Sequence, residues 1–193
     1  MAKRKLNVTL TGEAPMLMHN GQLADPLNKI VKAMKQITAK GKNKTEADLI
    51  KLSELEFKGG LYLDSKQKNI EIPSHLLEAT VKAGAKATRK GKIAEQGVFV
   101  ETPGKFNYKG PKTVDALFNS DDHRLTIAVV VQKSRIMRTR PKFDSWSVDA
   151  TYVYDDQIVN RQEVVEWLTK AGEVAGIGDW RPRYGRFKVT VKR

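Results

Sequence analysis

The order of strand-like and helix-like patterns is the feature that most limits how this chain can fold. Residues 6–10 and 187–191, near its two ends, alternate apolar and polar side chains, which is the period of a strand with one buried face. Apolar residues at helical spacing mark two helices between these strands, at 74–89 and 160–171. Further strands are predicted at 98–100, 125–131 and 147–154, and a hairpin at 61–63 and 70–72.

This order predicts an α+β fold, an antiparallel sheet with helices on one face. A ferredoxin-like or RRM-like β-α-β-β-α-β core is the expected skeleton, within a single domain spanning 1–193. We expect residues 25–57 to form a helical insertion and residues 102–123 a loop-rich insertion. Ser74 is expected to cap the first helix, and Asn160 with Glu163 to form a capping box on the second.

The charge balance indicates an anionic partner. Thirty-five Lys and Arg against 22 Asp and Glu give a net charge of +13, which favours contact with nucleic acid or an anionic membrane. No apolar run approaches the roughly 18 residues of a membrane span, and the N-terminus lacks a signal-peptide pattern. The absence of Cys excludes disulfides and thiolate metal sites. We therefore expect a cytoplasmic protein with no membrane partner.

The excess positive charge is concentrated in four stretches that contain no acid. They lie between Asp25 and Glu46, between Glu78 and Glu95, between Asp122 and Asp144, and after Asp179. The early stretches are rich in Lys, which we interpret as a source of electrostatic field, although a solvated helix face explains them equally well. The late stretches are rich in Arg, whose planar guanidinium suits phosphate contact. In the second stretch the candidate contacts are Lys86, Arg89 and Lys90.

The third stretch combines basic and aromatic residues. Pro141 favours an extended backbone before it, so the basic side chains should project from a strand end. Interleaved aromatics can stack on bases, at about 1–3 kcal/mol per base. Phe143 and Trp146 are alternatively core anchors, with only the basic residues facing outward. The candidate nucleic-acid contacts here are Arg135, Arg138, Arg140, Lys142 and Trp146.

The last stretch lies in a loop punctuated by glycine before the final strand. Glycines permit positive φ, and successive amides can form an anion-binding nest. The pattern lacks the Gly-Lys-Ser/Thr of a Walker loop and is not a dinucleotide fingerprint. A turn that merely requires glycine is the alternative, but the density of Arg favours binding. The candidates are Gly176, Gly178, Trp180, Arg181, Arg183 and Arg186.

This loop, together with the Ile-Pro-Ser-x-Leu-Leu helix start at 72–77, resembles the RAMP superfamily of CRISPR RNA-binding proteins. The resemblance covers 61–77 and 136–187, and the loop departs from the more Gly-rich version of that family. It implies an RRM-related fold, nucleic-acid contact at Arg181, Arg183 and Arg186, and assembly of subunits along a strand. A chain of this kind also resembles phage or prophage proteins.

Catalysis is not expected. His19 lies in the loop after the first strand, where a RAMP-type endoribonuclease would place an acid or base, but no nucleophile–base pair accompanies it. His75 lies in the first turn of a helix. His123 follows Asp121 and Asp122, a sequence adjacency that is not metal-ligand geometry. We therefore expect no catalytic residue, no metal and no cofactor.

Three hypotheses follow for function. The first is a non-catalytic protein that grips the backbone of single-stranded RNA or DNA, as repeating subunits of a ribonucleoprotein filament. The second is a phage-encoded interaction protein that mimics or blocks a CRISPR-type complex by contacting its proteins. The third is a His19-dependent endoribonuclease. The choice between RNA and DNA depends on contacts to the 2′-OH, which the sequence leaves open.

Overall fold

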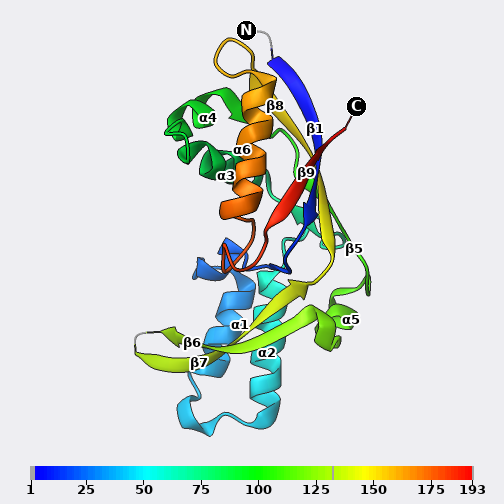
Figure 1. Cartoon of the computed structure of the whole chain (residues 1–193). Helices are drawn as coiled ribbons and strands as arrows, with labels where there is room; N and C mark the ends of the chain where they lie inside the picture. Colours follow the sequence, from blue (N-terminus) through cyan, green and yellow to red (C-terminus); the bar gives the residue numbers. More distant parts are fainter. Residues whose placement is uncertain (1–2, 132, 193) are drawn as a thin grey trace. The chain divides into compact units, whose positions relative to one another are not determined.

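The computed structural model of this protein describes residues 3–131 and 133–192, which form two compact units (Figure 1). Unit 1 comprises residues up to 17, residues 63–109 and residues from 143 onward. Unit 2 comprises residues 18–62 and 110–142. The expected helical insertion, 25–57, lies wholly in unit 2, and the expected loop-rich insertion, 102–123, is divided between the two.

Unit 1 is built on an antiparallel sheet. Its four main strands lie in the order β5, β8, β1, β9, with each neighbour antiparallel. Two helices of unit 1 lie between β1 and β5, and one lies between β8 and β9. This is the ferredoxin-like arrangement that the sequence predicts, with one extra short helix. The strands of this sheet are β1 (Lys3–Gly12), β3 (Glu71–Ile72), β4 (Val98–Phe99), β5 (Gly104–Tyr108), β8 (Trp146–Asp155) and β9 (Phe187–Val191). The short strand β2 (Met16–Leu17) lies outside it.

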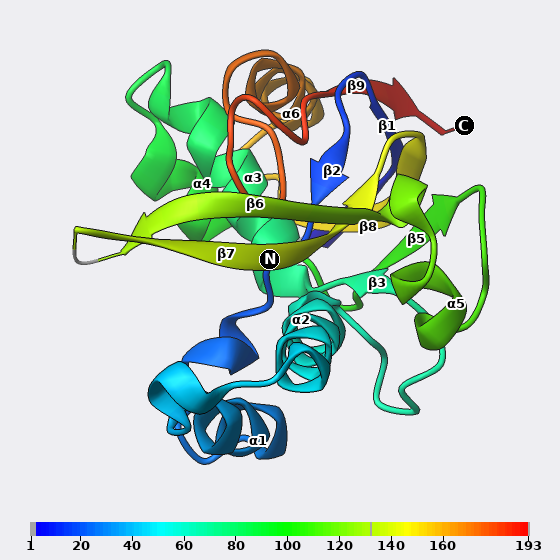
Figure 2. The ribbon, with the colours of Figure 1, turned by 90° about the horizontal axis from the view of Figure 1, so that it is seen from below.

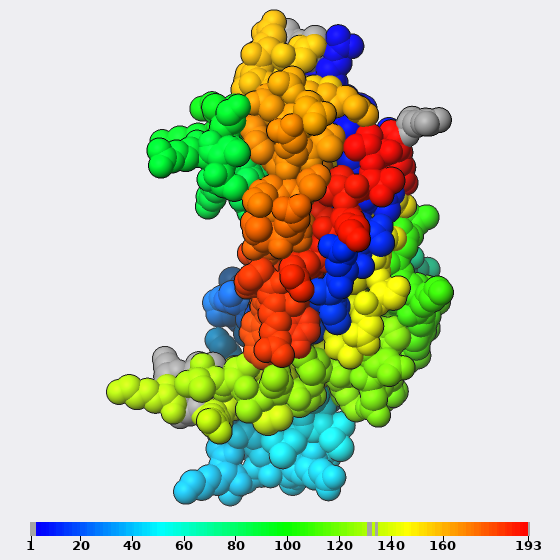
Figure 3. All heavy atoms as spheres, viewed as in Figure 1, coloured from blue at the N-terminus to red at the C-terminus, as the bar shows by residue number. Residues whose placement is uncertain are grey.

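Three helices cover one face of this sheet: α3 (Ser74–Lys86), α4 (Gly91–Gly97) and α6 (Arg161–Val174) (Figure 1). Leu6, Val8 and Leu10 of β1 are buried, as their alternation predicts. Helices α3 and α6 pack closely at Gly84, where a Cβ atom would lie 1.8 Å from the carbonyl oxygen of Trp167. On the face shown in Figure 3, α6, β9 and β1 lie side by side.

Of the two predicted helix caps, at Ser74 and Asn160, only the second is confirmed. Asn160 and Glu163 form the expected capping box at the start of α6. Ser74 is not the N-cap of α3, because it is already the first helical residue and Pro73 occupies the cap position without a side-chain hydrogen bond. Pro73, with its fixed φ and no N–H, therefore begins this helix in place of a serine cap.

Unit 2 combines a helical hairpin with a β-hairpin, as Figure 2 shows. Phe57 of α2 packs edge-on against Phe118 of α5, with ring centroids 5.6 Å apart. This contact joins the helical hairpin to the loop-rich region. The elements are η1 (Gly21–Ala24), α1 (Lys29–Thr38), η2 (Gly41–Asn43), α2 (Glu46–Gly60), α5 (Val114–Phe118), η3 (Asp121–His123), β6 (Arg124–Val131) and β7 (Ser134–Phe143).

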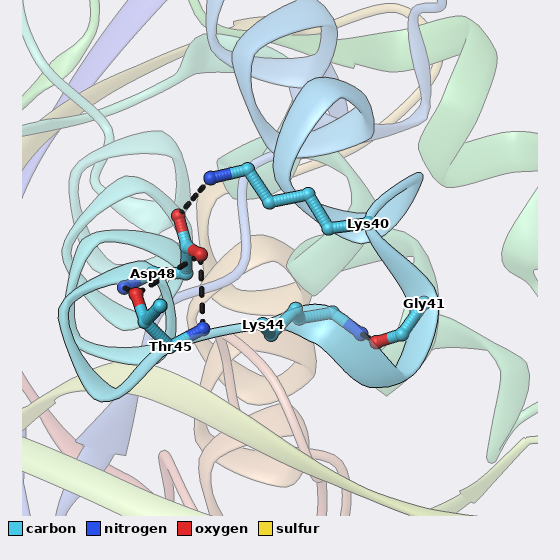
Figure 4. Close-up of polar contacts among 5 residues, drawn as sticks. All are labelled: Lys40, Gly41, Lys44, Thr45 and Asp48. Atoms are coloured by element: carbon cyan, nitrogen blue, oxygen red, sulfur yellow. Dashed lines mark hydrogen bonds and ion pairs between the residues drawn. The ribbon is translucent and has the colours of Figure 1, made fainter.

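The turn between α1 and α2 is fixed by a network that Figure 4 shows. Thr45 and Asp48 form a capping box on α2, and the ammonium of Lys40 lies 2.6 Å from the Asp48 carboxylate. This hydrogen bond to Lys40, more than the backbone N–H of Thr45, lowers the pKa of Asp48 to about 2. Lys44 donates to the carbonyl oxygen of Gly41 at 2.7 Å.

Two sequence predictions need correction, one on the position of a strand and one on the loop-rich insertion. Residues 125–131 are not a central strand: β6 pairs with β7 at the edge of a hairpin, where Val130 is 68% exposed. A β-branched run fits any pleated surface, so it does not specify a central position. The region 102–123 is also more regular than expected, since it contains β5 and α5. No helix among the described residues is both long and apolar enough to cross a membrane.

Candidate nucleic-acid interface

The loop between α6 and β9, residues 175–186, carries three exposed arginines of unit 1, and we call it the arginine loop. Gly176, Gly178 and Gly185 adopt φ values of +70°, +90° and +75°. A Cβ atom at Gly185 would lie 1.7 Å from the carbonyl oxygen of Ile177, and one at Gly178 would lie 2.5 Å from that of Leu17. The loop therefore requires glycine both for its backbone conformation and for close packing against neighbouring backbone.

Several backbone amides of this loop are satisfied within unit 1. Gly176 donates to Ala171 at 2.8 Å, and Ile177 donates to Gly185 at 2.9 Å. Asp179 donates to the carbonyl oxygen of Leu17 at 2.8 Å, and Gly185 donates to that of Pro15 at 2.8 Å. The N–H groups of Gly176, Ile177, Asp179 and Gly185 already bind carbonyl oxygens, which argues against their use in an anion-binding nest. The glycines hold the loop in shape instead.

The three arginines of the loop point their charges to solvent. Arg181, Arg183 and Arg186 are all exposed, and within the described part of the chain none forms an ion pair with a carboxylate. The carbonyl oxygen of Arg186 accepts hydrogen bonds from the amides of Glu13 and Ala14, which ties the end of the loop to the segment after β1. Fixed backbone and available guanidinium groups are what a phosphate-binding loop needs.

Two aromatic rings accompany these arginines. Trp180 and Tyr184 are half-buried, with ring centroids 6.1 Å apart and planes inclined by 41°. Trp180 has a φ of +53°, a left-handed conformation that is uncommon for a bulky residue. Trp180 therefore lies in the same loop as the arginines, as the sequence predicts.

The second basic stretch lies at the other end of α6. Lys90 forms an ion pair of 2.5 Å with Glu163, in the first turn of that helix. This hydrogen bond, with that from the Asn160 backbone, lowers the pKa of Glu163. Lys86 and Arg89 are exposed at the same corner. Because α6 has 14 residues, about 21 Å separates this corner from the arginine loop, so unit 1 does not bring the two clusters together.

The third basic stretch lies along β7, and its last basic residue, Lys142, precedes the final residue of that strand. Arg135 is exposed near the turn of the hairpin, and Arg140 and Lys142 are half-buried. Arg138 forms an ion pair with the buried Glu56 of α2.

The carboxylate of Glu56 also accepts the backbone N–H of Thr139 at 2.9 Å. Arg138 therefore forms its ion pair within unit 2. The two partners lie 82 residues apart, so no local sequence pattern predicts this pair.

The hypothesis that Trp146 stacks on a base is wrong. Trp146 is 3% exposed, and its indole N–H donates to the carbonyl oxygen of Ala14 at 2.9 Å. Its ring stacks near Phe106, with centroids 6.3 Å apart, and Phe143 is buried beside them. The alternative of a core anchor is the correct one. A buried indole with its N–H satisfied is a stable core element.

The histidines occupy separate places. His19 lines a cavity of about 340 Å³ in unit 2 together with Arg138 and Arg140. His75 is exposed in the first turn of α3, and the Nδ1 atom of His123 lies 3.0 Å from the hydroxyl of Ser120. Among the described residues, no cluster of His, Cys, Asp or Glu is arranged to hold a metal ion.

The open face of the unit 1 sheet is a polar surface that was not among the predicted contacts. Asp149 of β8 accepts a hydrogen bond from Thr9 at 2.7 Å and one from Asn107 at 3.2 Å, and lies 2.6 Å from Lys192. The hydrogen bond to Lys192, followed by that to Thr9, lowers the pKa of Asp149. The alternation of β1 carries the signal for this face, because polar residues there fall opposite the buried Leu6, Val8 and Leu10.

Comparisons with known proteins show a similarity of structure without one of sequence. No protein-family model matches the chain, and no curated protein sequence matches it. A chain from a cryo-EM structure of the type III-B Cmr-beta complex bound to cognate target RNA is similar, with a TM-score of 0.48 and 9% sequence identity. The similarity covers 98% of this chain and 60% of that chain, so this chain spans less than two thirds of its length.

Proposed function

We propose that this protein binds the backbone of single-stranded nucleic acid, with RNA as the preferred ligand, and that it does so without catalysis. The observation that carries the proposal is the arginine loop. Its backbone is fixed by internal hydrogen bonds, while Arg181, Arg183 and Arg186 remain exposed without a carboxylate partner among the described residues. Because hydrogen bonds already hold the backbone, phosphate binding would restrict mainly the arginine side chains.

The charge and the fold of the chain support the same function. A net charge of +13 provides a long-range attraction for polyanions, and the ferredoxin-like sheet of unit 1 agrees with the resemblance to the RAMP superfamily. Trp180 and Tyr184 add aromatic surface next to the arginines. Arg135 of unit 2, and Lys86 and Arg89 at the far corner of unit 1, are secondary contacts in this proposal. We also propose that copies of the protein assemble along the strand, in a complex of CRISPR type.

The test is fluorescence anisotropy with a labelled 20-nucleotide single-stranded RNA of mixed sequence. The variant carries Arg181→Ala, Arg183→Ala and Arg186→Ala. If each phosphate contact contributes about 1 kcal/mol, the affinity should fall by about 100-fold. The slope of log K against log salt should become shallower by about 2, since each neutralised phosphate of a single strand contributes about 0.7.

A matched control removes the same charge elsewhere. Lys29, Lys32 and Lys35 all lie in α1 of unit 2 and are exposed. Replacing these three by Ala lowers the net charge equally but should change the affinity by less than about fivefold, because only the general field is weakened. Equal losses in the two triple variants would show that the loop has no specific role. Binding that is unchanged in the Arg variant would refute the proposal.

The assembly is tested separately by light scattering after size-exclusion chromatography, with RNAs of 20, 40 and 60 nucleotides. Assembly along the strand should give a mass that rises in steps of one protein for each added site. A single protein bound at every RNA length would contradict it. An absorbance ratio at 260 and 280 nm on the freshly purified protein, followed by RNase and DNase treatment, decides between RNA and DNA.

A second candidate function rests on the cavity that contains His19. The cavity brings an imidazole together with Arg138 and Arg140, the groups that general acid–base catalysis and phosphorane stabilisation would use. Arg138 is already paired with Glu56, which weakens this candidate. Purified protein incubated with labelled RNA should produce no cleavage. Cleavage that disappears in His19→Ala would replace the non-catalytic proposal with a ribonuclease.

A further inference from the structure

Unit 2 carries an apolar groove between α2 and the β6–β7 hairpin, which we call the α2–β7 groove. It has a volume of about 740 Å³ and is lined entirely by residues of unit 2. The volume is in the range typical of well-formed ligand pockets. The apolar side chains that line it are Leu49, Ile50 and Leu52 of α2, Phe118 of α5, and Ile136 and Met137 of β7.

Three large apolar side chains in the groove are more than half exposed to solvent. Leu49, Ile50 and Met137 are 54%, 56% and 59% exposed, although large apolar side chains are usually covered. They lie next to one another along a single groove and are not scattered singly. A contiguous exposed apolar surface of this kind is typical of an interaction site.

The polar atoms in the wall of the groove are already satisfied. The hydroxyls of Ser53 and Thr139 lie 2.7 Å apart, and that of Thr126 lies 3.1 Å from Thr139. Glu56, the carboxylate that lines the groove, binds Arg138 and the Thr139 amide. These four side chains therefore offer little to a polar ligand, and an occupant gains by burying apolar side chains in the groove.

The charged groups at the rim are mainly positive. Lys44 donates to a backbone carbonyl and not to a carboxylate (Figure 4). Arg124 lies over the ring of Phe118 and pairs with Asp121, which is almost fully exposed. Asp48, on the neighbouring turn of α2, is held by Lys40. Unit 2 as a whole has fifteen Lys and Arg against eight Asp and Glu.

From the apolar floor and the cationic rim, we infer that the α2–β7 groove binds an acidic amphipathic helix of a partner protein. Apolar residues at the i, i+3, i+4 and i+7 positions of such a helix would enter the groove, and its Glu or Asp residues would face Lys44 and Arg124. A second copy of this chain is a poorer occupant, because unit 2 would repel itself. Nucleic acid is also a poorer occupant, because the floor is mainly aliphatic and bases stack on aromatic rings.

The test uses three fluorescein-labelled 16-residue peptides and the full chain. All three have the same Leu residues at helical spacing, and their polar faces carry Glu, Gln or Lys. The Glu peptide should bind in the micromolar range, and the Lys peptide at least tenfold more weakly. Lys44→Gln should weaken the Glu peptide and leave the Gln peptide unchanged. Equal binding of the Glu and Lys peptides, or no binding of either at 100 µM, would overturn the inference.

A matched pair of substitutions locates the binding surface. Leu49→Glu places a carboxylate in the groove and should reduce binding of the Glu peptide at least tenfold. Leu27→Glu makes the same change at a position in unit 2 that is 73% exposed and does not line the groove, and it should have no effect. Circular dichroism shows whether each variant is folded. If Leu49→Glu fails to fold, Ile50→Glu, at the next position of α2, takes its place.

Two further results would assign the groove to another occupant and refute the inference. One is a mass corresponding to a dimer in light scattering that falls to the monomer mass in Leu49→Glu. The other is an RNA affinity that drops in Leu49→Glu but not in Leu27→Glu. Unchanged RNA binding and monomer mass in both variants, with loss of the Glu peptide in the first alone, would support the acidic helix.

Discussion

Replacing Gly185 by Ala should disrupt the arginine loop and remove much of the stability of unit 1 with it. Gly185 has a φ of +75°, which costs an L-residue about 1–2 kcal/mol. A Cβ atom there would lie 1.7 Å from the backbone oxygen of Ile177, so the loop must move. That movement disrupts two hydrogen bonds, from Ile177 to Gly185 and from Gly185 to Pro15, each worth about 1 kcal/mol.

The sum of these effects is about 3–4 kcal/mol, which corresponds to a fall in Tm on the order of 10 °C. Tryptophan fluorescence is a selective assay, because Trp146, Trp167 and Trp180 all belong to unit 1. Far-UV circular dichroism follows both units. The same variant should also weaken RNA binding, since the loop positions Arg181, Arg183 and Arg186.

The matched control is Gly21→Ala. A Cβ atom at Gly21 would meet no heavy atom within 4 Å, and Gly21 does not adopt a positive φ, so the Tm of this variant should change by less than about 2 °C. A Gly185→Ala protein with the Tm and RNA affinity of the parent would refute the reasoning that backbone packing fixes this loop.

Two more predictions concern unit 2. Glu56→Gln leaves Arg138 without its partner and should lower the free energy of unfolding by about 2–3 kcal/mol, measured in urea titrations followed by circular dichroism. The control, Glu54→Gln, changes a more accessible site on the same helix and should cost less than about 1 kcal/mol. Equal effects of the two substitutions would contradict the role of the buried pair. Asp48→Asn should destabilise the protein at neutral pH. Because the folded pKa of Asp48 is lowered to about 2, its contribution to stability is complete above the unfolded value of 3.8 and is lost as pH falls toward 2. The Tm values of parent and variant, measured at a series of pH values, should therefore converge near pH 2. A difference in Tm that persists at pH 2 would rule out the carboxylate as its cause.

The sequence alone was sufficient for the elements that bury one face. Strands β1, β8 and β9 and helices α3 and α6 appear in the predicted order, because a half-buried element imposes its own period on the chain. The Asn160–Glu163 capping box could also be predicted from the sequence, since both partners lie within four residues. The arginines at 181, 183 and 186 are exposed, and their contact with nucleic acid stays a prediction.

The tertiary structure alone decided what the remaining basic and aromatic residues do. Trp146 and Trp180 both lie near arginines in the sequence, yet the first is buried in the core and the second is half-buried in the loop. Arg138 pairs with Glu56 across 82 residues, and the loop amides bind carbonyl oxygens near residues 15–17. Periodicity and capping depend on residues a few positions away, so the local sequence predicts them. Burial, ion pairing and the separation of charge clusters depend on which distant segments meet, and only the folded chain determines that.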